Sequence, residues 1–275
     1  MKFTDENFPR LSIVRGSQTL NDEQGWFGPF NGANDGELAI EAIHEVLPIR
    51  QCKPKITNRS MATASPCALL DMGKCGAPCI GAQSVDSYFT LTSTANQYLS
   101  IDSREVIEQH ESKMNELALA ERFEEAAEVR NRLSAFIRGT SRAQRIRALT
   151  RVPEIITALK ITDNAKWEFV SIRYGRLAGS ALSKAGINLS HTIESLKLTS
   201  EVVLPKDQIL PASSHEEVEL LLNYLDSPGL RLVEVVGEWQ LPIFGSGRAR
   251  ANLADVRKSY EADNRWLTAI QLDSN

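Results

Sequence analysis

The sequence predicts an α+β protein in which helical segments precede a small mixed domain. Apolar residues return every three or four positions over residues 38–47, 84–98 and 103–149, which is typical of amphipathic helices. Two runs that resemble paired strands, KWEFVSIRYG and RLAGSALS, follow at 166–183. Residues 50–81 show little periodicity and contain all four cysteines. A chain of 275 residues with 42% hydrophobic residues is long enough to give more than one part its own core.

The amino-terminal part predicts a hairpin followed by a helix. PRLSIVR (9–15) alternates well enough for a strand, and WFGPF (26–30) follows a polar turn as its expected partner. Asp35 is the expected cap of the helix over residues 38–47, which Pro48 ends.

A helical hairpin is predicted in the middle of the chain. Ser103 is the expected cap of its first helix, and ERF (121–123) provides a short break before the second. Two amphipathic helices joined this tightly should pack antiparallel. The second helix is expected to continue past Gly139 toward Leu149.

A small α+β domain is predicted after this hairpin. Ser214 and Glu217 have capping-box spacing before VELLLNYL (218–225), which predicts a helix there. The other elements expected in this part are a helix after Pro153, the strand pair at 166–183, a helix over 192–203, a buried strand over 230–237 and a helical tail over 251–270.

The composition and the amino-terminal residues favour a cytoplasmic protein. MKFTDENFPR contains acids and no apolar core of a signal peptide, and no apolar run approaches the roughly 18 residues that a membrane span needs. We therefore expect no membrane partner. Because cytoplasmic thiols are kept reduced, a disulfide framework is a poor explanation for the four cysteines.

The cysteines are spaced C-x14-C-x7-C-x3-C, as Cys52, Cys67, Cys75 and Cys79. A loop-rich segment of this length buries little and needs another constraint to hold its shape. Four thiolates suit zinc or an iron–sulfur cluster. Zinc sites usually show paired, closely spaced cysteines, so the wide spacing favours a cluster. Zinc and four unrelated buried thiols remain alternatives at this point.

Basic residues lie around the cysteines although the net charge is −4. We take four of them as candidate contacts to DNA phosphates: Arg50, Lys53, Arg59 and Lys74. A second basic run holds seven arginines and no acid between Arg130 and Arg151. The alternative for both runs is a solvated protein surface without a nucleic-acid partner.

Several of these motifs together resemble the central region of the UvrC excinucleases. They are FPRLSIVR, FGPF, PIRQC, SPCALLDMGKCGAPCIG and MNELALAERFEEAAEVRNRL, in this order over residues 7–138. The last is similar to the UVR motif, with Asn131 in place of an aspartate. The resemblance implies that Cys52, Cys67, Cys75 and Cys79 ligate a [4Fe-4S] cluster, with zinc as the alternative cofactor. RLVEVVGEWQLPIFGSGRA resembles the tail of actinobacterial fusion proteins that join an exonuclease, a GIY-YIG domain and a UvrC-like region.

The resemblance also implies a domain plan. Residues 1–48 would be the remnant of a GIY-YIG-like module, here a partial hairpin and helix, and 49–100 the four-cysteine cluster region. Residues 101–139 would be the UVR helical hairpin, followed by a small α+β domain over 140–275. On this plan the chain is truncated at its amino terminus. The sequence shows no GIY…YIG pair, no acidic triad of an RNase H-like nuclease and no helix-hairpin-helix tail.

The function implied by the resemblance is a DNA-binding component of nucleotide excision repair that does not cut DNA by itself. The hairpin would dock a UvrB-like helicase subunit through Phe123, Ala127 and Leu133, with Glu124 and Arg130 as rim charges. Two alternatives remain. One is a subunit of a structure-specific endonuclease whose N-terminal nuclease half lies on a separate polypeptide or in the rest of a longer gene. The other is a zinc-stabilised binding module outside repair. The hairpin could also belong to a bundle within the chain.

Overall fold

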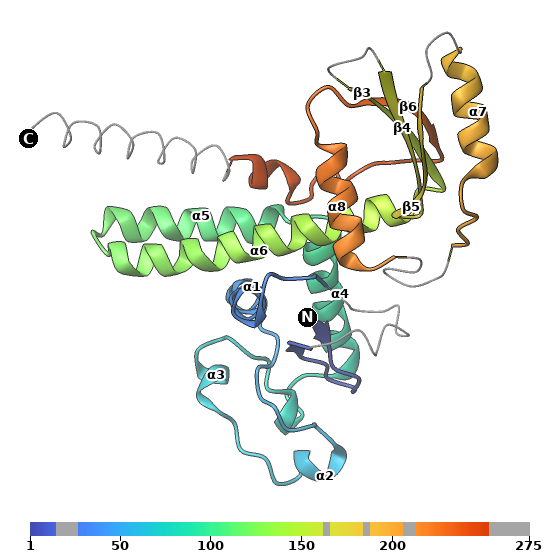
Figure 1. The fold of residues 1–275 in the computed structure, drawn as a ribbon. Helices are drawn as coiled ribbons and strands as arrows, with labels where there is room; N and C mark the ends of the chain where they lie inside the picture. Colours follow the sequence, from blue (N-terminus) through green and yellow to red (C-terminus); the bar gives the residue numbers. More distant parts are fainter. Residues whose placement is uncertain (15–26, 162–165, 184–187, 206–212, 253–275) are drawn as a thin grey trace, which may run out of the picture. The chain divides into compact units, whose positions relative to one another are not determined.

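The computed structural model describes residues 1–14, 27–161, 166–183, 188–205 and 213–252, and confirms the α+β class (Figure 1). The chain forms two compact units. The described residues of the first unit are 1–14, 27–142 and 242–252, and those of the second are the remaining ones from 143 to 241.

The first unit begins with a two-residue strand pair. β1 (Lys2–Phe3) pairs antiparallel with β2 (Leu11–Ser12). The predicted strand over 9–15 is therefore shorter than expected, and its predicted partner at 26–30 is wrong, because residues 27–30 form no strand and residue 26 lies outside the described residues. Within this run Phe27 exchanges backbone hydrogen bonds with Met1 instead, at 2.9 and 3.1 Å, and Pro29 has no N–H with which to extend a strand ladder.

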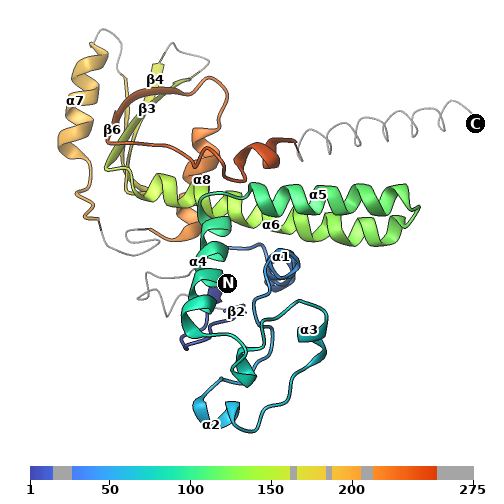
Figure 2. The ribbon, with the colours of Figure 1, turned by 180° about the vertical axis from the view of Figure 1, so that it is seen from behind.

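Four long helices make up most of the first unit: α1 (Ala33–Val46), α4 (Val85–Ser100), α5 (Arg104–Leu119) and α6 (Phe123–Thr150). Figures 1 and 2 show α5 and the first part of α6 side by side and antiparallel, as the hairpin pattern predicted. The predicted break between the two helices is confirmed, although it covers residues 120–122 and Phe123 already belongs to α6, which continues through Gly139. A side chain at 139 would overlap the Phe30 ring that packs there, so this helical glycine serves close packing.

The helix caps differ in part from the prediction. Gly32 occupies the N-cap position of α1, and Asp35 lies inside the first turn. Ser103 does precede α5, but its hydroxyl donates to the Tyr98 carbonyl. The carboxylate of Asp102 accepts from the Arg104 N–H instead, at 3.1 Å. A negative group beside the first turn of α5 complements the helix dipole.

The core of the first unit is one apolar cluster in which all four long helices take part. Its fully buried members include Ile43 of α1, Tyr88 and Leu99 of α4, Val106 of α5, and Phe136 of α6. Because helices from across the sequence share this core, the base of the helical hairpin is held by tertiary packing.

The second unit contains an antiparallel sheet of order β5-β4-β3-β6. Its strands are β3 (Glu154–Ile161), β4 (Lys166–Arg173), β5 (Arg176–Leu182) and β6 (Arg231–Val236). The predicted strand pair is confirmed, whereas the predicted helix after Pro153 is wrong. β3 is buried on both faces, and such a continuous apolar run cannot be told from a buried helix by its periodicity.

One helix covers each face of this sheet. α8 (His215–Leu225) packs with Ile155, Val170 and Ile172 on one face. α7 (Leu189–Thr199) packs with Ala158 and Phe169 on the other. Figures 1 and 2 show α7 and α8 on opposite sides of the strands.

Three further predictions for the second half have mixed outcomes. Ser214 caps α8 by accepting from the Glu217 N–H, as predicted, but the Glu217 carboxylate accepts from the Leu177 N–H of β5. β6 was expected to be buried, yet it is an edge strand, and Leu232 is 52% exposed. The predicted helical tail lies outside the described residues beyond residue 252.

The boundaries of the two units do not follow the predicted domain plan. Residues 1–14 and 27–139, which span the first three predicted domains, lie within the first unit, and the boundary with the second falls inside α6, after Arg142. Residues 242–252, expected in the last domain, belong to the first unit. No helix among the described residues has the length and apolar character needed to cross a membrane.

The position of Phe136 predicts a large effect on stability. Phe136→Ala should lower the free energy of unfolding of the first unit by about 3–5 kcal/mol, because the ring is fully buried and a cavity would remain. Phe123 lies on the same helix and is 65% exposed, so Phe123→Ala is a matched control with an expected cost below about 1 kcal/mol. Urea unfolding followed by circular dichroism measures both, and equal costs would contradict this account of the core.

Candidate functional site

The cysteine segment is built from short turns and little regular structure. α2 (Asn58–Met61), α3 (Ala68–Asp71) and the 3-10 turn η1 (Pro78–Ile80) are its only elements among the described residues 50–81. Cys67 occupies the N-cap position of α3, and Cys79 lies in η1. η1 is flanked by two residues with left-handed backbone, Ala77 (φ 51°) and Gly81 (φ 73°). The segment is therefore a looped chain that presents side chains from its turns.

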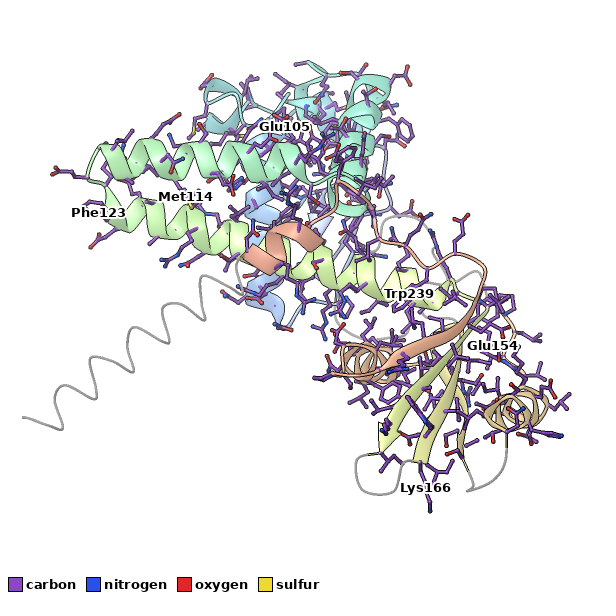
Figure 3. All side chains as sticks on the ribbon, turned by 90° about the horizontal axis from the view of Figure 1, so that it is seen from above. Glu105, Met114, Phe123, Glu154, Lys166 and Trp239 are labelled. Atoms are coloured by element: carbon purple, nitrogen blue, oxygen red, sulfur yellow. The ribbon has the colours of Figure 1, made fainter. Side chains whose placement is uncertain are left out.

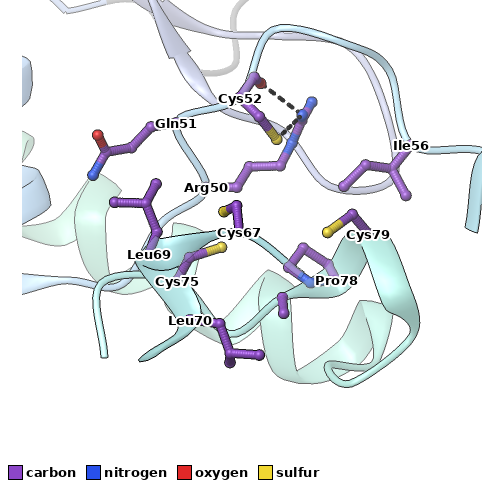
Figure 4. A pocket seen from close by; sticks show the side chains of 11 residues that line it. Arg50, Gln51, Cys52, Ile56, Cys67, Leu69, Leu70, Cys75, Pro78 and Cys79 are labelled. Carbon is purple, nitrogen blue, oxygen red and sulfur yellow. Dashed lines mark hydrogen bonds between the residues drawn. The ribbon is translucent and has the colours of Figure 1, made fainter. Parts of the chain in front are cut away.

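All four predicted ligand residues line one pocket. Cys75 is buried, Cys79 is half-buried, and Cys52 and Cys67 are exposed. Figure 4 shows their sulfur atoms turned toward a common space. The other residues that line this pocket are Arg50, Gln51, Ile56, Leu69, Leu70, Ala77 and Pro78.

The surroundings of Cys75 disfavour its thiolate. Burial raises the pKa of the Cys75 thiol above its ordinary value, and charge on Cys52, Cys67 and Cys79 adds to the rise. A hydrogen bond with the Ala77 backbone acts in the opposite direction. Among the described residues, no three His, Cys, Asp or Glu side chains have the arrangement of a metal-binding group. What the structure brings together is four thiols around one pocket.

Arg50 was predicted to contact DNA, and its position contradicts that role. The side chain is fully buried, and its guanidinium is occupied by protein groups. A phosphate cannot reach it without disrupting the first unit. The sequence signal, a basic residue beside the cysteines, could not distinguish a surface cation from a buried one.

The other three predicted DNA contacts lie at the surface. Lys53, Arg59 and Lys74 are exposed, as is Lys55 beside them. No ion pair to an acid is found for Lys53, Arg59 or Lys74 within the part of the chain that the structure describes. Their positive charge is thus available to an external anion.

The arginine run on α6 is partly neutralised within the protein. Arg132 pairs with Glu45 and lies 3.8 Å from Glu41, both on α1. Arg138 pairs with Asp35 of the same helix at 3.3 Å. These two arginines therefore fasten α6 to α1, and the phosphate-contact interpretation of the run does not apply to them.

The free end of the α5–α6 hairpin exposes apolar side chains (Figure 3). Phe123 is 65% exposed, and Leu119, which was not among the predicted docking residues, is 88% exposed. Its signal was an apolar residue two positions before the ERF break. We call Leu119 and Phe123 the hairpin tip.

The remaining predicted docking residues divide between surface and core. Glu124 and Arg130 are exposed and Ala127 is half-buried. Leu133 is only 4% exposed and belongs to the core of the first unit, so its predicted contact with a partner is wrong. An amphipathic pattern marks the apolar face of a helix but does not say how far along the helix the chain itself covers that face.

Comparison with known proteins places these features in context. Residues 1–98 match the family model of the UvrC/Cho excinuclease middle domain, and residues 104–136 match the UvrB/uvrC motif. The first match contains all four cysteines, and the second contains the hairpin tip.

Curated relatives match the chain at moderate identity. A putative bifunctional exonuclease/endonuclease protein of Mycobacterium tuberculosis is 26% identical over 98% of this chain and 41% of its own length. The UvrABC system protein C of Chlorobaculum tepidum is 27% identical over 82% of this chain and 37% of its own. That of Rickettsia bellii is 34% identical over 48% of this chain and 20% of its own. The chain thus spans less than half the length of these relatives.

No solved structure matches the chain. The two family models nevertheless cover both the cysteine pocket and the hairpin. The chain therefore has a UvrC-like central region, in which residues 1–98 match the model of the UvrC/Cho excinuclease middle domain and residues 104–136 match the UvrB/uvrC motif.

Proposed function

We propose that this chain is a UvrC-like component of nucleotide excision repair that binds DNA and a UvrB-like helicase subunit. The observation that carries the proposal is the hairpin tip, an exposed apolar surface within the segment that matches the UvrB/UvrC motif. The relatives named UvrABC system protein C support a role in that system.

The hairpin tip has the chemistry of a helix-docking surface. Large apolar side chains gathered at one end of a hairpin are stabilised when a partner removes them from water. The Arg122–Glu125 ion pair of 2.5 Å lies next to the tip, and Glu124 and Arg130 are exposed farther along α6. Since the motif is named for both UvrB and UvrC, we propose that the partner contributes a matching hairpin. Phe123 is the apolar anchor, with Glu124, Ala127 and Arg130 around it.

If the partner docks at the hairpin tip, a substitution there should weaken its binding and a substitution elsewhere should not. Phe123→Ala should weaken association with a UvrB-like subunit at least tenfold, because a buried aromatic anchor usually costs more than about 1.4 kcal/mol when removed. Phe89 of α4 is 70% exposed and lies outside the hairpin, so Phe89→Ala is a matched control. Isothermal titration calorimetry measures both, and equal weakening by the two variants would contradict docking at the tip.

We also propose that the exposed cations of the cysteine segment bind the DNA backbone. Lys53, Arg59 and Lys74 come from three separate places in one short segment, Arg59 from α2, and have exposed side chains. Contacts of this kind position a protein on DNA without reading its sequence. The proposal therefore assigns this segment to backbone binding.

The DNA proposal predicts a change in salt dependence. Replacing Lys53, Arg59 and Lys74 by Gln should reduce the slope of log K against log[salt] by about 0.9 for each lost phosphate contact on duplex DNA. A matched control replaces Lys113, Lys160 and Lys166, which are also exposed but lie elsewhere. Fluorescence anisotropy over a salt series measures the slope. Identical slopes for the two triple variants would contradict the proposed site.

As cofactor we propose a [4Fe-4S] cluster held by Cys52, Cys67, Cys75 and Cys79. The donor set fits: four thiols from separate turns line one pocket, and soft thiolate ligands are those that iron–sulfur clusters and zinc use. Such a cluster would crosslink the looped segment and add a one-electron redox centre. Zinc bound by the same thiols, in a module outside repair, is the alternative.

We propose that the segment given by this chain does not cut DNA by itself, since its sequence shows neither the GIY…YIG pair nor an evident acidic triad. The alternative is a structure-specific endonuclease subunit that an N-terminal nuclease half completes, whether that half lies on a separate polypeptide or in a longer gene. The purified chain with Mg²⁺ or Mn²⁺ should leave damaged and bubble-containing duplex DNA intact, as measured on denaturing gels. Incision that persists in independent preparations, and that scales with the concentration of this chain, would contradict the assignment.

A further inference from the structure

We propose that Arg50 is a positioning residue of the four-cysteine site: its buried guanidinium donates to the Cys52 sulfur and couples this ligand to the amino-terminal segment. The inference rests on the proposed cofactor. It assigns a role to a residue that the sequence placed among the DNA contacts.

The geometry places Arg50 between two pieces of chain, residues 6–8 and residues 52–54. Its Nε donates to the Phe8 carbonyl at 2.6 Å. Its Nη1 donates to the Pro54 carbonyl at 2.9 Å, and to the carbonyl and sulfur of Cys52 at 2.8 and 3.3 Å. Figure 4 shows the two bonds to Cys52. The Arg50 side chain thus connects Phe8, which precedes α1, to Cys52, the first of the four proposed ligands.

The charge of Arg50 is balanced by Glu6. Nη2 of Arg50 lies 2.6 Å from Glu6 Oε2, an ion pair that does not have the alignment of a hydrogen bond. The side chains are 0% and 7% exposed, so both charges are shielded from water. Thr4 donates to the other carboxylate oxygen of Glu6 at 2.6 Å. Because a buried charge without its partner is strongly destabilising, this arrangement fixes where the guanidinium lies.

The contact with Cys52 becomes stronger when that residue is a ligand. A metal ligand is a thiolate, and an N–H of a guanidinium then forms a charge-assisted hydrogen bond with it. Groups that donate to ligand atoms orient them and tune the metal, and hydrogen bonds to the sulfurs help set the potential of an iron–sulfur cluster. Arg50 is such a donor to a ligand sulfur, and its guanidinium is buried and held in place by other protein groups.

A lysine could not replace Arg50 in this role. The planar fork of the guanidinium directs its N–H groups to Phe8, Pro54 and Cys52 at once, whereas an ammonium is a single compact charge on a flexible stem. Arg50→Lys therefore keeps the positive charge opposite Glu6 but loses the simultaneous bonds. This makes it the informative conservative substitution.

Tyr88 provides a matched control because its hydroxyl contacts the Arg50 main chain. Its hydroxyl accepts from the Arg50 backbone N–H at 3.1 Å and donates to the Pro9 carbonyl at 2.9 Å. Burial raises the pKa of this hydroxyl, which therefore stays protonated. Tyr88 thus joins neighbouring residues of the same two pieces of chain but donates nothing to a sulfur. Tyr88→Phe thus loosens the surroundings and leaves the donor to Cys52 in place.

The experiment uses the full chain purified without oxygen, as wild type, Arg50→Lys, Tyr88→Phe and Cys75→Ser. Iron and acid-labile sulfide per chain, visible circular dichroism, reduction potential and the rate of bleaching by a chelator are measured for each. The wild type should contain iron and sulfide, and Cys75→Ser should lose them. Arg50→Lys should bleach at least tenfold faster than the wild type, with a lower potential, whereas Tyr88→Phe should keep the wild-type spectrum and potential.

A measurement on the wild type covers the case in which Arg50→Lys does not fold. Reconstitution in D₂O should shift an iron–cysteine stretching band in the resonance Raman spectrum, because deuterium replaces the hydrogen that the guanidinium donates to the sulfur. If the wild type holds iron but Arg50→Lys and Tyr88→Phe have the same bleaching rate and potential, the role of Arg50 is overturned while the proposed cofactor stands. An unshifted Raman band has the same consequence. A wild type that holds zinc or no metal overturns the proposed cofactor, and this inference with it.

Discussion

The position of the cysteine segment in the first unit depends on the hydrogen bonds and the ion pair of the buried Arg50 guanidinium. The guanidinium binds the Phe8 carbonyl, the Pro54 carbonyl and the main chain of Cys52, with Glu6 as its counter-charge. Beyond this anchor, residues 50–81 contribute only a few buried side chains. A segment with so little burial depends on polar anchors at its start, and the proposed metal bound by its thiols would add a second constraint.

The α5–α6 hairpin is packed into the core at its base and exposes apolar side chains at its far end. At its base, Val106 and Phe136 enter the core with α1 and α4, and the Arg132–Glu45 and Arg138–Asp35 pairs reinforce that packing. At its far end, the hairpin tip leaves large apolar side chains in water. A rigid base that presents an uncovered apolar end is what a docking element needs, since little order must be gained on binding.

Much of this arrangement could be predicted from the sequence because it depends on local patterns. Amphipathic spacing predicted the long helices, and the four cysteines were recognised by their clustering. The failures concern burial and pairing, which local patterns do not determine. Arg50 is inside because a distant residue, Glu6, neutralises it. β3 is a strand because β4 and β6 flank it, and Leu133 is covered because α6 passes over the shared core.

Our central proposal is that metal bound by the four thiols and the Arg50 anchor together hold residues 50–81 in shape. Amide hydrogen exchange, measured by mass spectrometry on the protein purified without oxygen and again after chelation, tests it most directly. The account predicts that protection over residues 50–81 falls on chelation, while protection in the paired parts of α5 and α6 is retained. Unchanged exchange over residues 50–81 after complete removal of metal would contradict it.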